Sequence, residues 1–208
     1  MKLPVEFVNT QEWTLVGPMG PKVPESFLSN PILCVDGGSN FTTKMDIWVG
    51  DGDSSTQAIS APHIFKFSPQ KNESDLALAL NLLSHESPRT LHLWGFVGGR
   101  KDHELLNLGE VMHYLDKATH TQAIFYDDQA RPTYRALSSG DWVFSHEGVF
   151  TVASFKSVKL KILGQVSYPL NEFTELLPLS SLGLSNEAKG EIQIINQAPV
   201  MVIFPELN

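Results

Sequence analysis

The stretch over residues 35–55, VDGGSNFTTKMDIWVGDGDSS, constrains the fold more than any other part of the chain. Two short apolar runs, residues 32–35 and 47–49, lead directly into glycine and aspartate, as buried strands do when the backbone turns sharply at their ends. Open α/β sheets bind ligands at the carboxyl ends of such strands. The stretch therefore predicts neighbouring strands with carboxylates at their ends.

Asp51 and Asp53 flank Gly52, so both side chains can reach one point in space. Mg²⁺ takes one or two carboxylates and fills its other positions with water and phosphate oxygens. Asp36 and Asp75 also stand at the predicted end of a strand or start of a helix, and a phosphoryl-transfer site needs this grouping. The alternative is a pair of ordinary polar turns, with Asp75 acting as the acidic partner of Asn72 in a helix cap.

The first part of the chain alternates between strand and helix patterns. Further strands are predicted at residues 13–16, 63–67, 90–96 and 121–126, and helices at residues 75–85 and from residue 103 onwards. The second helix is expected to bury one face, formed by Leu105, Leu108, Met112 and Leu115. This rhythm is typical of a parallel sheet with crossover helices, so we predict an α/β nucleotide-binding domain over residues 1–128.

Residues 129–208 have a different pattern of apolar and polar residues. Short apolar runs at residues 142–144, 150–153, 158–163, 191–195 and 200–204 are separated by Gly, Ser, Asn and Pro. Residues 158–162, VKLKI, alternate as a half-buried antiparallel strand does. We therefore predict a C-terminal all-β domain, a sandwich or a barrel.

Composition excludes several classes of binding partner. The formal net charge of −8 argues against a nucleic-acid partner or an anionic membrane surface, because both need clustered Lys and Arg. The first residues lack the apolar run of a signal peptide, and no stretch approaches the length of a membrane span. The single cysteine, Cys34, cannot form an internal disulfide. We expect a cytoplasmic protein without membrane contact.

A second ligand-binding element is predicted at Gly98, Gly99 and Arg100, between a strand and a helix start. Exposed amides and the helix dipole favour an anion there, and arginine can bind phosphate through two hydrogen bonds. The alternative is an ordinary solvated loop. The chain has no GxxxxGK[ST] loop, no full GxGxxG and no Cys/His cluster, so neither a P-loop nor a zinc site is expected.

Several of these segments together resemble the thiamin pyrophosphokinase family. DGG at 36–38 followed by Asn40 is similar to that family's DGGAN element, GDGDS at 50–54 to GDFDS, and KNESD at 71–75 to KDxTD. GGRKDH at 98–103, with Asn107 one turn on, is similar to GGRxDH…N. In the second part, YPL at 168–170 and SLGLSNE at 181–187 resemble the family's YPL and SxGxSNE segments.

The resemblance implies an α/β nucleotide domain followed by a β-sandwich, a homodimer with the thiamin pocket between subunits, and transfer of pyrophosphate from ATP to the thiamin hydroxyl with release of AMP. It implies that Asp51, Asp53 and Asp75 are catalytic and hold Mg²⁺. Ser185 and Asn186 are expected to face thiamin. The implied nucleotide site consists of Asp36, Gly37, Gly38, Asn40, Lys71, Asn72, Gly98, Gly99, Arg100, Asp102 and His103.

This chain departs from the family pattern in a few places. Asn72 stands where the family has aspartate, Gly52 replaces a phenylalanine, Lys101 replaces an apolar residue, and Glu187 follows Asn186 where an aromatic residue is common. Two alternatives therefore stay open: a related pyrophosphokinase or nucleotide hydrolase with another acceptor, or a nucleotide-binding dimer without catalysis.

Overall fold

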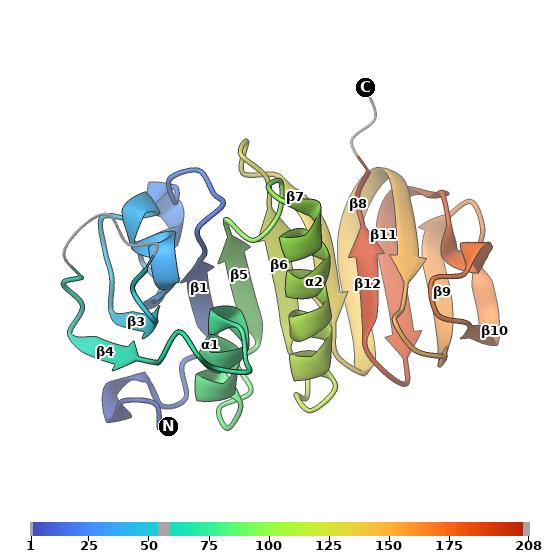
Figure 1. Cartoon of the computed structure of the whole chain (residues 1–208). Coiled ribbons are helices and arrows are strands. Elements are labelled where there is room, and N and C mark those ends of the chain that lie inside the picture. Colours follow the sequence, from blue (N-terminus) through green and yellow to red (C-terminus); the bar gives the residue numbers. More distant parts are fainter. Residues whose placement is uncertain (1, 54–58, 206–208) are drawn as a thin grey trace.

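A single row of hydrogen-bonded strands forms the centre of the molecule. The computed structural model describes residues 2–53 and 59–205. Within them twelve strands lie in the order β10-β9-β11-β8-β12-β7-β6-β5-β1-β2-β3-β4. Figure 1 shows this row from β4 at the left to β10 at the right, with helices α1 and α2 in front of it. The protein thus has a mixed sheet with few helices.

The strands of the first part pair in parallel, as the strand and helix rhythm predicts. Their bounds are β1 Glu12–Val16, β2 Ile32–Val35, β3 Ile47–Gly50, β4 His63–Lys66, β5 Thr90–Trp94 and β6 Gln122–Tyr126. Every residue of β2 and β3 is buried. Continuous apolar runs of this kind are typical of parallel strands covered on both faces.

The two α-helices cover one face of these strands. Helix α1 spans Asp75–Leu83 and α2 spans Lys101–Leu115. Ser74 caps α1, because its hydroxyl accepts a hydrogen bond from the backbone N–H of Ala77 at 3.0 Å. The proposed cap at Asn72 is therefore wrong. No helix among the described residues is long and apolar enough to cross a membrane.

One of the four residues predicted for the buried face of α2 is on the surface. Leu108, Met112 and Leu115 are buried, whereas Leu105 is 57% exposed. The helix begins at Lys101 and its first buried residue is Leu108, so Leu105 precedes the part of α2 that packs on the core.

The apolar core lies on both sides of the parallel strands. Successive strand residues point to opposite faces. Leu33 and Val35 of β2 pack with the helices in one cluster, and Ile32 and Cys34 pack in a second cluster on the other face. Short 3-10 helices complete the layers: η1 Val5–Phe7, η2 Glu25–Phe27, η3 Asp36–Phe41 and η4 Ser181–Gly183.

The second part consists of antiparallel strands and η4 within the described residues. Their bounds are β7 Pro132–Leu137, β8 Gly140–Ala153, β9 Val158–Val166, β10 Leu170–Leu176, β11 Asn186–Asn196 and β12 Val200–Ile203. The runs at 142–144 and 150–153 are one strand, not two. It pairs with β11 over Gly140–Phe150 and with β12 over Thr151–Ala153. The sandwich arrangement and the boundary at residue 128 stay predictions.

The sequence pattern misses β7 and β10. Strand β7 begins with proline and β10 carries polar residues over most of its length, LNEFTEL, so neither has an apolar run. Pairing across the sheet supplies what the local sequence lacks: β7 lies between β6 and β12, and β10 pairs with β9.

Two glycine substitutions test how tightly η3 packs on the sheet. A Cβ at Gly38 would lie 1.9 Å from the Val16 carbonyl oxygen, whereas a Cβ at Gly109 in α2 meets nothing within 4 Å. We expect Gly38→Ala to lower the free energy of unfolding by about 1–3 kcal/mol. The control, Gly109→Ala, should raise it by about 0.5–1 kcal/mol. Urea unfolding followed by circular dichroism measures both, and a neutral Gly38→Ala would show that η3 is loosely packed.

Candidate active site

Three aspartates from three separate elements meet at the carboxyl ends of the parallel strands. Asp36 follows β2, Asp51 follows β3, and Asp75 is the first residue of α1. One carboxylate oxygen from each lies within 4.8 Å of the other two. Parallel pairing of β2 with β3 brings the first two together, and the Ser74 cap fixes where α1 begins. We call these three residues the aspartate group.

Asp36 is the most enclosed member of the aspartate group. Asp36 is 8% exposed, and its backbone φ of 46° lies in the left-handed region. The indole N–H of Trp48 donates a hydrogen bond to the Asp36 carbonyl oxygen at 2.9 Å. A left-handed residue directly after a strand turns the chain into η3. The backbone thereby directs this carboxylate toward the other two.

Lys71 holds the aspartate group together electrostatically. Its Nζ lies 2.7 Å from Asp51 Oδ2 and 3.2 Å from Asp75 Oδ1. The Lys71 side chain is 15% exposed, and those of Asp51 and Asp75 are 10% and 20% exposed. Solvent screens such pairs less than it screens surface pairs. One ammonium group therefore partly offsets three converging carboxylates.

The pKa values of the two paired aspartates shift in opposite directions. The hydrogen bond from Lys71 lowers the pKa of Asp51, and the backbone N–H of Asp53 adds to this effect. Burial raises the pKa of Asp75 more than Lys71 lowers it, and the charges of Asp36 and Asp51 raise it further. For Lys71, burial acts to lower the pKa, but the hydrogen bonds to both carboxylates outweigh it and the pKa is raised. Of these two aspartates, Asp75 is therefore the one that is harder to ionise.

Asp53 lies beside the aspartate group and is not one of its members. Its side chain is exposed, and its backbone N–H donates to Asp51 Oδ1 at 3.2 Å. The family resemblance implies a metal trio of Asp51, Asp53 and Asp75, whereas the structure gathers Asp36 with Asp51 and Asp75. The metal role of Asp53 stays a prediction. Ser54, which completes the GDGDS segment, lies outside the described residues.

A cavity of about 310 Å³ opens beside the aspartate group. Asp36, Lys71 and Asp75 line it, together with His103 and Asn107 of α2. Asn107 Nδ2 donates to the Phe96 carbonyl oxygen at 2.9 Å, which fastens α2 to the loop after β5. Asn72 is exposed and lines a separate depression between α1 and α2. Asn72 is therefore separated from Asp36, Lys71 and His103 among the predicted nucleotide residues.

The predicted phosphate loop lies at the start of α2, next to this cavity. Arg100 and Asp102 are exposed and paired, with Arg100 Nη2 2.6 Å from Asp102 Oδ2. This hydrogen bond lowers the pKa of Asp102 to about 2. Both charges stand in solvent, so the pair can open at little cost. Asn40 lies apart, in a depression next to η3 and η2.

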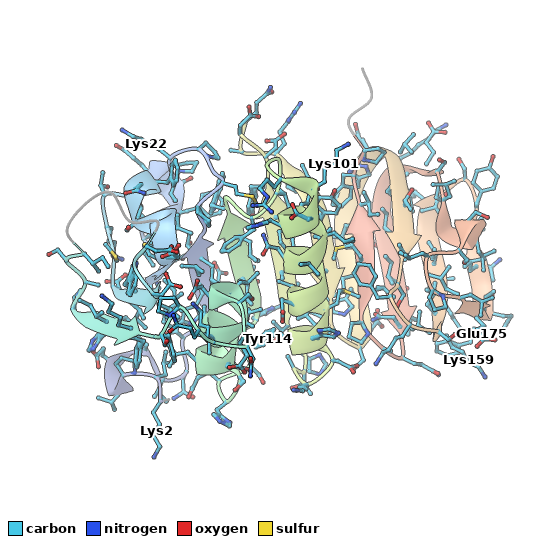
Figure 2. All side chains as sticks on the ribbon, viewed as in Figure 1. Lys2, Lys22, Lys101, Tyr114, Lys159 and Glu175 are labelled. Atoms are coloured by element: carbon cyan, nitrogen blue, oxygen red, sulfur yellow. The ribbon has the colours of Figure 1, made fainter. Side chains whose placement is uncertain are left out.

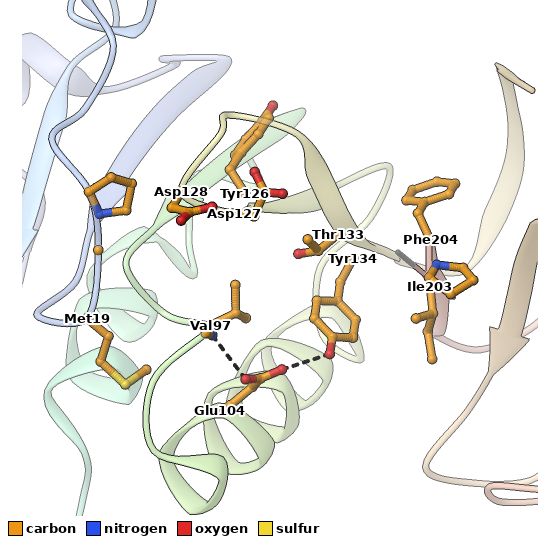
Figure 3. Close-up of a pocket in the computed structure, with 14 residues that line it drawn as sticks. Met19, Val97, Glu104, Tyr126, Asp127, Asp128, Thr133, Tyr134, Ile203 and Phe204 are labelled. Carbon is orange, nitrogen blue, oxygen red and sulfur yellow. Dashed lines mark hydrogen bonds between the residues drawn. The ribbon is translucent and has the colours of Figure 1, made fainter. Parts of the chain in front are cut away.

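A larger cavity, of about 610 Å³, lies on the other side of Met19. Met19 lines both cavities, which therefore adjoin along the same edge of the sheet. Figure 3 shows Glu104 beneath this second cavity, where it accepts hydrogen bonds from the Gly98 backbone N–H at 3.0 Å and from the Tyr134 hydroxyl at 2.7 Å. Sequence reasoning did not find Glu104, since its partners are 6 and 30 residues away.

The predicted thiamin residues lie far along the chain from the aspartate group, where η4 leads into β11. Ser185 is exposed, and its backbone N–H donates to Thr151 Oγ1. The buried Asn186 accepts from the backbone N–H of Tyr168 and donates to its carbonyl oxygen. Its side chain joins the YPL segment to β11. Among the described residues, neither lines the cavities beside Met19.

Comparison with known proteins agrees with this fold. The family model for the thiamin pyrophosphokinase catalytic domain matches residues 27–124. The solved structure of thiamine pyrophosphokinase from Bacillus subtilis is similar over 94% of this chain and 100% of its own, with a TM-score of 0.72 and 19% sequence identity.

Two fungal enzymes show the same likeness at lower identity. Thiamin pyrophosphokinase from Candida albicans matches 97% of this chain and 90% of its own, with a TM-score of 0.69 and 13% identity. The yeast enzyme matches 98% of this chain and 91% of its own, with a TM-score of 0.66 and 12% identity. A sequence search of curated proteins gives no match.

At such identities the solved structures establish the fold, and the domain match adds a likeness in sequence over residues 27–124. That match covers β2, β3, α1, β5 and α2, the elements that position the aspartate group and the loop at Gly98. The match over residues 27–124 and the shared fold make this chain similar to the thiamin pyrophosphokinases.

Proposed function

We propose that this enzyme transfers the pyrophosphoryl group of ATP to the hydroxyl of thiamin, giving thiamin diphosphate and AMP with the help of Mg²⁺. The observation that carries the proposal is the aspartate group, which lies inside the segment matched by the catalytic-domain model. The cavities beside it lie at the carboxyl ends of parallel strands, where α/β sheets bind their ligands.

The donor set suits Mg²⁺. Three carboxylates with oxygens within 4.8 Å of one another offer hard oxygen ligands, with room left for water and phosphate oxygens. Asp36, Asp51 and Asp75 are the residues we assign to the ion, and we keep Asp53 as a fourth candidate. When bound, Mg²⁺ would offset negative charge on the phosphate oxygens during transfer.

Protein groups around the ion have separate tasks in this proposal. Without the ion, Lys71 partly offsets the charges of Asp51 and Asp75, and with the ion bound it would be free to turn toward a phosphate oxygen. The Gly99 backbone N–H before α2 donates to a phosphate oxygen, beside the Gly98 N–H that Glu104 holds, and Arg100 leaves Asp102 to bind the same group. His103, which lines the same cavity, completes the nucleotide site.

The acceptor site requires a second subunit in this proposal. Ser185 is exposed at the start of β11, on the part of the chain that carries the antiparallel strands, so a homodimer is needed to bring it to a partner's aspartate group. We keep the homodimer and the cytoplasmic location as predictions.

Product analysis tests the reaction directly. The protein is incubated with ATP and Mg²⁺, with and without thiamin, and the products are separated by chromatography. We expect AMP and thiamin diphosphate in equal amounts, and only when thiamin is present. Nucleotide breakdown that ignores thiamin would mean a different acceptor or hydrolysis, and no breakdown would mean a binding protein.

Removing a single charge from the aspartate group tests the metal assignment. Asp51→Asn and Asp75→Asn should each abolish turnover, because a metal ion contributes several kcal/mol of transition-state stabilisation. Urea unfolding should remain close to wild type. Asp36→Asn and Asp53→Asn form the discriminating pair: we expect the greater loss at Asp36. Ordinary activity in Asp51→Asn or Asp75→Asn would refute the assignment.

A substitution at Asn72 adds a negative charge, whereas the previous variants each remove one. Asn72→Asp restores the family's aspartate at an exposed position outside the aspartate group. We expect kcat/KM for ATP to stay the same or to rise. A sharp fall would assign Asn72 a role specific to this chain.

The opposite pKa shifts can be measured by a carboxyl ¹³C NMR titration of the protein without metal. As the pH falls, Asp75 should take up a proton before Asp51, because burial raises the pKa of Asp75 and Lys71 lowers that of Asp51. The stabilisation from ionised Asp51 is present above its ordinary pKa of 3.8 and is lost as the pH falls through its lower folded value. Lys71→Met should raise both pKa values. If neither changes, Lys71 does not contact the aspartates in solution.

A further inference from the structure

A cavity of about 580 Å³ lies at the amino ends of the parallel strands, opposite the ends that carry the aspartate group. Gln11, Arg89 and Gln122 line it at the amino ends of β1, β5 and β6. The first residues of β8 close its other side with Asp141, Trp142 and Phe144. Strands β1, β5 and β6 run parallel to one another, and the aspartate group lies at the carboxyl ends of the parallel strands. The length of the strands therefore separates this cavity from the proposed active site.

Arg135 of β7 is the unusual residue in this cavity. It pairs across the sheet with Ile124 of β6 and Val202 of β12, both apolar and both buried. Its Nε is buried and makes no hydrogen bond within the described chain. Arg135 is half-buried, and its guanidinium keeps its charge, so the enclosed Nε needs an anion or a hydrogen-bond acceptor to offset the loss of water.

The protein itself compensates Arg135 only weakly. The guanidinium carbon lies 4.4 Å from the centre of the Phe144 ring, a cation–π contact. Burial lowers the pKa of Arg135, and the opposing influence comes from Tyr126, a phenol, with no carboxylate contributing. Within residues 2–53 and 59–205, Arg135 forms no ion pair.

The remaining polar groups of the cavity favour an anion. Arg89 and His120 line it with Arg135, although the chain as a whole carries a net charge of −8. The one acidic residue in the lining, Asp141, accepts two hydrogen bonds from Gln193 Nε2, at 2.8 and 3.0 Å. These hydrogen bonds come from a neutral amide and hold the carboxylate toward β11, and the two arginines outnumber the one acidic residue of the lining.

We propose that this cavity binds a phosphate group through Arg135, with Arg89 at its rim, at a site separate from the substrates. Arginine recognises phosphate through parallel hydrogen bonds, and a partly enclosed cation binds it more strongly than a solvated one. The cavity volume of about 580 Å³ accommodates inorganic phosphate or the phosphate end of a larger ester.

Trp142 provides a local reporter for this site. It lines the cavity and is partly exposed, whereas Trp13, Trp48 and Trp94 are fully buried elsewhere in the core. Tryptophan fluorescence is followed while inorganic phosphate is added to the full-length protein in EDTA, at constant ionic strength. We expect a saturable change with a Kd on the order of 1 mM or below. In Trp142→Phe the fluorescence change should vanish, while calorimetry still detects binding.

Phosphate binding by point variants tests which residues form the site. Arg135→Met keeps an apolar stem and should weaken binding about tenfold or more, the size expected for a charged hydrogen bond. Arg89→Gln, at an exposed position, should weaken it less without affecting the fold. Lys159→Gln is the matched control, because it removes one positive charge on β9, at the far end of the strand row (Figure 2). Circular dichroism and thiamin diphosphate formation report that each variant is folded.

Other anions distinguish the sources of the phosphate group. A change with AMP as well as inorganic phosphate would show that phosphate esters enter the cavity, and a change with inorganic phosphate alone would limit the site to the free ion. Equal affinity for acetate would overturn the assignment to phosphate. So would the absence of a saturable signal in the wild-type protein, or equal phosphate affinity in Arg135→Met and wild type.

Discussion

Convergence of like charges at the end of a parallel sheet is the constraint on which the site depends. Asp36, Asp51 and Asp75 repel one another, and burial raises the cost for Asp75. The fold meets this cost with backbone elements that cannot move apart: β2 and β3 are paired and fully buried, and Ser74 fixes the start of α1. Lys71 supplies the compensating charge. Such a prearranged cluster of carboxylates is well suited to a divalent cation.

Much of the first part is predictable from sequence because its information is local. Ile32–Val35 and Ile47–Gly50 read as buried strands, and the glycines after them mark the ligand edge. The second part was harder to predict, since β7 and β10 are specified by pairing across the sheet and β8 runs through a polar stretch that looks like a break. Leu105 was assigned to the core by periodicity alone, and the end of the packed layer overrides that pattern.

The site shows the same division. The positions of the acids at strand ends group Asp36, Asp51, Asp53 and Asp75, whereas the family resemblance assigns the metal to Asp51, Asp53 and Asp75. The register of β2 with β3 is what brings Asp36 to Asp51. Glu104 and Arg135 were missed because their importance comes from Tyr134 and from buried neighbours on other strands. Residues that act through distant contacts leave no local pattern.

Anomalous diffraction from crystals grown with Mn²⁺ in place of Mg²⁺ tests the central claim most directly. We expect a strong peak at bonding distance from Asp36, Asp51 and Asp75, with Lys71 turned away from Asp51. A peak held by Asp53 without Asp36, or the absence of a peak between these carboxylates at saturating Mn²⁺ and nucleotide, would contradict it.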